Sequence, residues 1–287
     1  MDIIYRYDPF EKIAPRPALN AEGALKSLES GHLRYRHTVD RVKAELEGEI
    51  LTEPLVIKVD PLRLGLRDVA GVPLHTPYAL VLGCSDARAP IEQIFDQSPN
   101  DLFVIRVAGN VLGTECLGSI DYAVRNLGGS LALVVVLGHT GCGAVKAAVD
   151  LYLAPNDYPD LGLTHALRSL VDRVLIAVRG AAKAVDRVCG SDAKNHPGYY
   201  DALVETGVYL NAALTAFDVQ REVEMFQGNS RAGVVYGVFD LADQRVRSQP
   251  DQGTALPPPF AKVAESPSDL ESLGDRVVTA IVARGAL

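Results

Sequence analysis

The sequence is poor in cysteine, tryptophan and long apolar runs, and each shortage excludes a class of protein. Its 287 residues include four cysteines and no tryptophan. Four cysteines in a chain of this length do not form the disulfide framework of a small secreted domain. No apolar run approaches the roughly 20 residues that a membrane-spanning helix requires. The amino end lacks a basic segment followed by an apolar core, so we expect no signal peptide and a cytoplasmic location.

An excess of positive charge is also lacking. The chain has 28 Lys and Arg against 36 Asp and Glu, a formal net charge of −8, and no basic run offsets it. We therefore expect neither nucleic acid nor an anionic membrane as a partner. Hydrophobic residues make up 48% of the chain, which is ordinary for a globular protein of this size with a sizeable core.

Short apolar runs rich in β-branched residues alternate with helical patterns in the middle of the chain. The runs at 78–82 and 131–137 suit strands buried on both faces, and further strands are expected at 102–107 and 234–240. This alternation predicts an α/β fold with a parallel sheet, right-handed crossovers and flanking helices.

We expect three parts along the chain. Residues 1–77 contain an amphipathic helix capped by Asn20, which forms an N-terminal arm, and an irregular connector that includes several prolines. Residues 78–249 form the α/β core. Residues 250–287 form a Pro-rich tether and a final helix, with Ser266 as its N-cap.

Two motifs follow the two most apolar strands. Cys84 comes just after the first, and His139 and Cys142 come just after the second. The carboxyl ends of parallel strands lie at one edge of a sheet, where ligands bind in α/β folds. Two thiolates and an imidazole make a three-ligand zinc set, which in catalytic sites leaves a fourth position for water. The core therefore contains a predicted zinc site.

Asp86 and Arg88 lie two and four residues after Cys84, so in an extended loop all three side chains face one cavity. The Asp86 carboxylate has two competing partners, the metal and the Arg88 guanidinium. If Asp86 ligates zinc, the fourth position is filled. If Asp86 pairs with Arg88, the position opens to water, and zinc lowers the pKa of such a water to about 7.

Together these motifs resemble the β-class carbonic anhydrases. That family's Cys-x-Asp-x-Arg motif corresponds to residues 84–88, its Arg-x-x-x-Asn motif to 106–110, and its His-x-x-Cys-Gly motif to 139–143. The resemblance implies a four-stranded parallel core sheet with a further edge strand. It also implies a zinc enzyme that interconverts carbon dioxide and bicarbonate, in a homodimer built by swapped N-terminal helices or in a homotetramer.

By the same resemblance, Cys84, His139 and Cys142 are the zinc ligands, and Asp86 and Arg88 form a catalytic pair, with Asp86 a ligand in a closed state only. Three further positions match the substrate pocket: Phe103, Tyr122 and, where many members carry Gln before a Pro, His75.

Two alternatives stay open. A carbonyl sulfide or carbon disulfide hydrolase could use the same site on a related linear molecule. A zinc-stabilised binding protein without turnover would close the metal with four protein ligands, but such a site would have no use for Arg88.

Overall fold

A mixed sheet forms the centre of the structure. The structure is a computed structural model that describes residues 2–8, 20–49, 51, 53–58, 74–157, 164–225, 232–251 and 256–287. The strands of the sheet are ordered β4-β3-β5-β6-β7, and β8 also pairs with β6. The first four are parallel, whereas β7 and β8 run antiparallel to β6. The strand bounds are β3 Ala79–Gly83, β4 Leu102–Arg106, β5 Leu133–His139, β6 Gly233–Phe239, β7 Val246–Arg247 and β8 Ala261–Lys262. The predicted α/β fold, with four parallel strands and an added edge, is confirmed.

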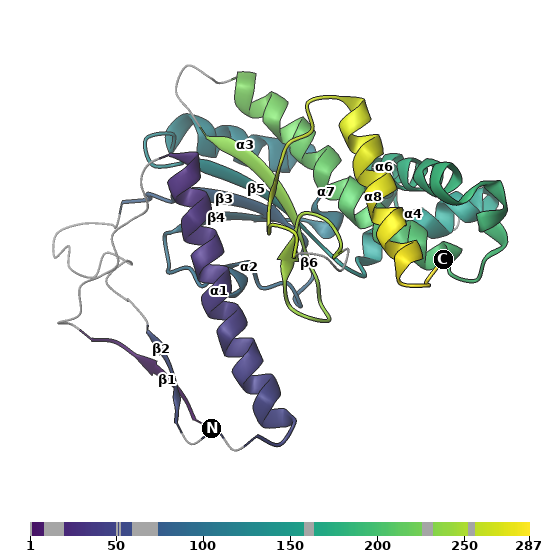
Figure 1. Cartoon of the computed structure of the whole chain (residues 1–287). Helices are drawn as coiled ribbons and strands as arrows, with labels where there is room; N and C mark the ends of the chain where they lie inside the picture. The colour runs from purple at the N-terminus through teal and green to yellow at the C-terminus, as the bar shows by residue number, and fades with distance from the viewer. Residues whose placement is uncertain are drawn as a thin grey trace.

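Helices cover both faces of this sheet, because successive strand residues point to opposite sides. In β3, Ala79 and Val81 pack in one apolar core, and Leu80 and Leu82 pack in the other. The first core includes residues of α1 (Ala21–Leu46) and α2 (Ile91–Ile94). The second is larger and includes residues of five further described helices: α3 Thr114–Asn126, α4 Gly143–Leu153, α6 His165–Cys189, α7 Tyr199–Met225 and α8 Pro267–Ala283. The result is a three-layer arrangement with α1 on one side and α4, α6, α7 and α8 grouped on the other (Figure 1).

The expected helix starts at both ends of the chain are confirmed. The Asn20 side chain accepts a hydrogen bond of 2.7 Å from the Gly23 N–H at the start of α1. Ser266 caps α8 through a capping box with Asp269, and Pro267 is the first helical residue. The predicted tether falls partly outside the described residues, and α8 packs in the larger core through residues such as Val277 and Ile281.

One element was not predicted. Strands β1 (Ile3–Arg6) and β2 (Leu55–Lys58) form a separate parallel pair, and β2 lies within the stretch predicted to be an irregular connector. The pair lies apart from the main sheet, beside the C-terminal end of α1 (Figure 1). Each strand has only four residues, too few to show a clear periodic pattern, and the two strands are about fifty residues apart in the sequence. The pair was therefore not predicted.

None of the described helices is both long enough and apolar enough to cross a lipid bilayer.

Candidate metal centre

The sheet brings three predicted ligands together at one edge. Strands β3 and β5 are neighbours with Gly83 opposite Leu137, so Cys84, directly after β3, lies beside the end of β5. His139 is the last residue of β5, and Cys142 is the N-cap of α4. One ligand atom from each of the three lies within 4.8 Å of the others, and all three residues are buried. Neighbouring parallel strands thus join motifs that are 55 residues apart.

The His139 ring is oriented by its own loop. Its Nδ1 lies 3.0 Å from the backbone oxygen of Thr140, so in the neutral form of the ring Nδ1 carries the proton and Nε2 carries the lone pair. The ring is 1% exposed, and Nε2 has no hydrogen-bond partner among the described protein atoms. A buried nitrogen without a partner is costly. A metal ion bound between Nε2 and the two sulfurs would satisfy it.

The pKa values of the two thiols are shifted in opposite directions. Interaction with Cys142 lowers the pKa of Cys84, and the same contact, together with burial, raises the pKa of Cys142. Burial opposes protonation of His139, but the Cys84 sulfur, the Thr140 carbonyl and the Asp86 carboxylate together outweigh it and raise the pKa of His139. This cluster holds a proton that a divalent cation would displace, because thiolate and neutral imidazole are the ligating forms. The donor set therefore fits a metal ion with an affinity for sulfur and imidazole.

Asp86 pairs with Arg88 rather than with the three ligands. Its Oδ1 accepts hydrogen bonds from the Arg88 N–H (2.9 Å) and Nε (3.0 Å), and its Oδ2 accepts one from Nη2 (2.7 Å). These hydrogen bonds hold the pKa of Asp86 well below its usual range. Oδ2 lies 3.8 Å from His139 Nε2, and Asp86 is not in the mutually close set of ligand atoms. An ionised carboxylate thus borders the ligand cluster without belonging to it.

The loop after β3 is held by Arg106 at the end of β4. Its guanidinium donates to three backbone oxygens, those of Cys84 (3.1 Å), Asp86 (2.6 Å) and Ala89 (3.1 Å). Because these carbonyls lie along the whole turn, one side chain fixes both the candidate ligand Cys84 and the path of the chain at Asp86. Arg106 was predicted only as part of a motif. Its contacts show that it holds the loop after β3 in place.

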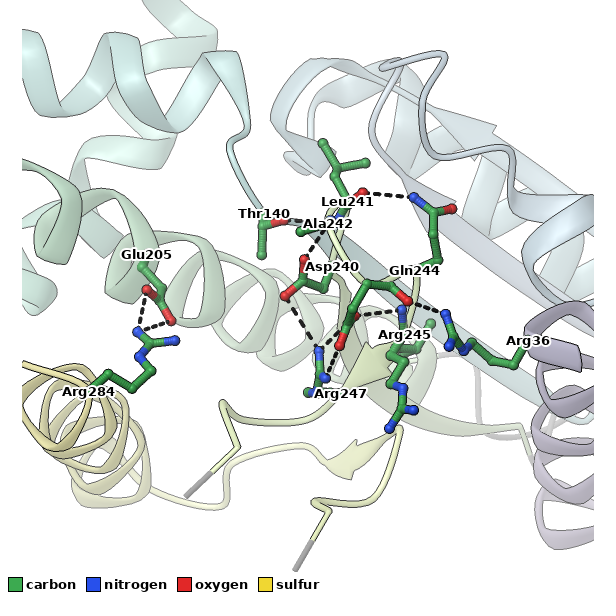
Figure 2. A network of polar contacts seen from close by, with 12 residues as sticks. Arg36, Thr140, Glu205, Asp240, Leu241, Ala242, Gln244, Arg245, Arg247 and Arg284 are labelled. Carbon is green, nitrogen blue, oxygen red and sulfur yellow. Dashed lines mark hydrogen bonds and ion pairs between the residues drawn. The ribbon is translucent and has the colours of Figure 1, made fainter. Parts of the chain in front are cut away.

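The loop after β5 is held by the turn between β6 and β7. The Thr140 hydroxyl accepts from the Leu241 N–H (3.0 Å), and the Thr140 N–H donates to the Phe239 oxygen (3.0 Å). Arg247 pairs with Asp240 and Asp243 in the same turn, and Arg36 of α1 donates to the Asp243 oxygen. Figure 2 shows these contacts as one network that reaches from α1 to Thr140, one residue from the candidate ligand His139.

Comparison with known proteins agrees with this geometry. A family model described as "Carbonic anhydrase" matches residues 79–236, more than half of the chain, which include every element of the metal centre. The chain belongs to the carbonic anhydrase family.

Two curated relatives are the carbonic anhydrase of Mycolicibacterium smegmatis and carbonic anhydrase 2 of Mycobacterium tuberculosis. The first is 40% identical over 133 residues, 41% of this chain and 61% of the relative. The second is 52% identical over 112 residues, 38% of this chain and 52% of the relative. The matches thus span between half and two thirds of these relatives' length. A solved β-carbonic anhydrase from Coccomyxa is 24% identical, with a TM-score of 0.47 over 64% of this chain and 76% of that one.

The three residues predicted for the substrate pocket form a row of rings at the edge strand β4. The His75 ring stacks on Phe103 with centroids 5.8 Å apart, and Phe103 lies 6.4 Å from Tyr122 of α3. Tyr122 is 51% exposed. No ring contact among the described residues joins this row to the metal ligands, so its part in a pocket stays a prediction.

Two supporting contacts were not predicted: the one between Thr140 and Leu241, and one from the Asn211 side chain of α7 to the Gly109 oxygen. Thr140 lies inside the His-x-x-Cys-Gly motif, but its partner Leu241 is about a hundred residues away. Asn211 places a buried amide within an apolar stretch of α7. A polar residue at such a position indicates a buried hydrogen bond, so it could have been used to predict one.

Proposed function

We propose that this chain is a zinc-dependent carbonic anhydrase that interconverts carbon dioxide and water with bicarbonate and a proton. The observation that carries the proposal is the unpartnered Nε2 of His139, buried between two thiols and bordered by an ionised aspartate. Membership in the carbonic anhydrase family supports it.

Cys84, His139 and Cys142 would hold the zinc ion, since two thiolates and one imidazole leave one of its four tetrahedral positions open. When bound, zinc supplies a Lewis acid that brings the pKa of a coordinated water close to 7. The low exposure of the three side chains, at most 7%, keeps bulk water from competing for the thiolates and the imidazole.

Asp86 would orient the attacking water. Its carboxylate lies beside the ligand cluster, and Arg88 keeps it ionised, so it is a hydrogen-bond acceptor across the neutral range. Arg88 fixes both carboxylate oxygens and leaves the remaining lone pair of Oδ2 free to take a hydrogen bond. The proton released in hydration would pass from this region to buffer.

The pairing of Asp86 with Arg88 corresponds to the open form of the site. We propose that Asp86 exchanges between Arg88 and zinc, and that it ligates the metal in a closed form. Crystal structures of the zinc-loaded chain at about pH 6.5 and pH 8.5, on either side of the expected water pKa, test the exchange. An open zinc with the Asp86–Arg88 pair intact at both pH values would rule it out.

The alternatives are less well supported. The curated relatives are named carbonic anhydrases, which does not favour a carbonyl sulfide or carbon disulfide hydrolase. A purely structural zinc site would not explain why a guanidinium holds a carboxylate at its border.

We also propose a cytoplasmic homodimer or homotetramer. The four cysteines are all free, which suits a reducing compartment. Three consecutive residues of β1, Ile3, Ile4 and Tyr5, are 47%, 43% and 69% exposed, an apolar strand that a second copy would cover. Light scattering coupled to gel filtration would show a monomer if this is wrong.

Stopped-flow hydration of carbon dioxide by the zinc-loaded chain tests the activity. We expect turnover that rises from about pH 6.5 to about pH 9, the range that brackets the expected water pKa, and that disappears in Cys142→Ala. Zinc-loaded protein without turnover over this range would refute the proposal.

A further inference from the structure

A backbone amide donates to one of the ligand sulfurs. The Gly109 N–H points to Cys84 Sγ at 3.3 Å, and both residues are buried. Gly109 has φ +69°, in the left-handed region that favours glycine, and a Cβ at this position would lie 2.8 Å from the Ala144 Cβ. An N–H that donates to a thiolate withdraws negative charge from the sulfur, so this bond changes how strongly Cys84 donates to a metal.

The same glycine is held from its other side by a distant side chain. Asn211 of α7 donates from Nδ2 to the Gly109 oxygen at 2.8 Å, across 102 residues of sequence. Asn211 is 4% exposed, and its neighbours in α7 include the buried Leu210 and Ala212. An amide in such surroundings is costly unless its hydrogen bonds are satisfied. Gly109 provides a partner that an aliphatic side chain at position 211 could not use.

We propose that Asn211 is a positioning residue of the metal centre. By fixing the Gly109 carbonyl, it holds the glycine in the conformation that aims the N–H at the Cys84 sulfur. The order of contacts is Asn211 to Gly109 to Cys84, from helix to turn to ligand. Asn211 thereby sets the metal affinity of the centre and the charge that Cys84 donates. This inference rests on the proposed function only in taking Cys84 as a metal ligand.

The test compares Asn211→Leu with Thr206→Val. Thr206 is a matched control, because it lies on the same helix, is fully buried, and its hydroxyl has no partner among the described atoms. Zinc affinity is measured by competition with a chelator. In the cobalt-substituted proteins, the sulfur-to-cobalt charge-transfer band reports the charge on the thiolates.

We expect Asn211→Leu to lower zinc affinity by about 10- to 100-fold, the usual cost of an outer-shell partner. The charge-transfer band should move to longer wavelength, because a thiolate without its N–H partner is more easily oxidised. Thr206→Val should change neither. If Asn211→Leu does not fold, Asn211→Ser, which is too short to reach the Gly109 oxygen, should show the same two changes.

Wild-type affinity and an unshifted band in a folded Asn211 variant would overturn the proposal, whatever its thermal stability. These readouts do not depend on turnover. A wild-type chain that binds zinc but does not hydrate carbon dioxide would therefore refute the proposed function and leave this inference intact.

Discussion

Two buried histidines show what distinguishes a structural imidazole from a proposed metal ligand in this fold. His32 of α1 is 4% exposed, and His139 of β5 is 1% exposed. Each ring places Nδ1 against a backbone oxygen, that of Ile94 at 3.1 Å and that of Thr140 at 3.0 Å. The difference lies at Nε2. In His32 it accepts the Val246 N–H at 3.0 Å, whereas in His139 it has no hydrogen-bond partner among the described atoms.

The surroundings of the two rings differ accordingly. His32 joins α1 to α2 and to β7, and burial lowers its pKa. His139 faces Cys84, which raises its pKa, and Asp86 lies 3.8 Å away. Similar burial therefore does not mean a similar role. A ring that is hydrogen-bonded at both nitrogens connects elements of the fold, whereas a ring whose Nε2 lacks a hydrogen-bond partner and lies beside two thiols is suited to bind a cation.

The largest expected effect is that of His139→Ala. It should remove bound zinc and reduce carbon dioxide hydration by more than the roughly 100-fold that loss of an outer-shell partner can cost. His32→Gln should keep one zinc per chain and wild-type turnover per folded molecule. Metal analysis and stopped-flow kinetics on both variants check this. Loss of zinc from a folded His32→Gln variant would contradict the distinction between the two histidines.

The next effect concerns the Asp86 carboxylate, 3.8 Å from the free side of the His139 ring. Asp86→Asn should lower hydration by about 10²- to 10⁴-fold, the usual contribution of a positioned acid–base group. Zinc content should not change, because Asp86 is outside the ligand set. Asp96→Asn is the matched control, since Asp96 pairs with Arg34 on the surface. Equal losses in the two variants would show that Asp86 acts through general electrostatics.

A smaller effect should follow from His32→Gln on stability. The substitution disturbs two buried hydrogen bonds to backbone groups, so the free energy of unfolding should fall by about 1–3 kcal/mol. His37→Gln, on the exposed side of the same helix, should stay within about 0.5 kcal/mol of the wild type. Denaturant titrations measure both. Equal stability of the two variants would contradict the fastening role of His32.

The smallest effect is a pH dependence of that stability. Burial, helped by Arg36 and Arg245 and opposed by the Ile94 carbonyl and Asp243, lowers the pKa of His32. The folded chain then binds fewer protons than the unfolded chain, so the His32 contribution is complete above about pH 6.5 and is lost as the pH falls toward the lowered pKa. The stability gap between wild type and His32→Gln should narrow from about pH 7.5 to about pH 5.5. A constant gap would contradict this assignment.

The clustering of the three candidate ligands could be predicted because these residues lie at or just after strand ends. Runs of buried β-branched residues placed Cys84 and His139 after two parallel strands, and neighbouring strands bring their ends together. Cys142 follows in a single loop. These are local signals combined by one rule of sheet geometry.

The supporting contacts could not be predicted in the same way. The partners of Arg106 are backbone oxygens, which leave no trace in side-chain patterns. Asn211 reaches Gly109 from a helix whose register against the sheet depends on the packed core. The pairing of β1 with β2 likewise depends on where α1 returns the chain. Each needs the tertiary arrangement.

X-ray absorption spectroscopy of the zinc-loaded chain tests most directly that the free nitrogen of His139 marks a metal site. We expect two Zn–S contacts near about 2.3 Å and two Zn–N/O contacts near about 2.0 Å. This pattern should persist in His32→Gln and be lost in His139→Ala. Zinc without sulfur neighbours, or the same spectrum in both histidine variants, would contradict the account.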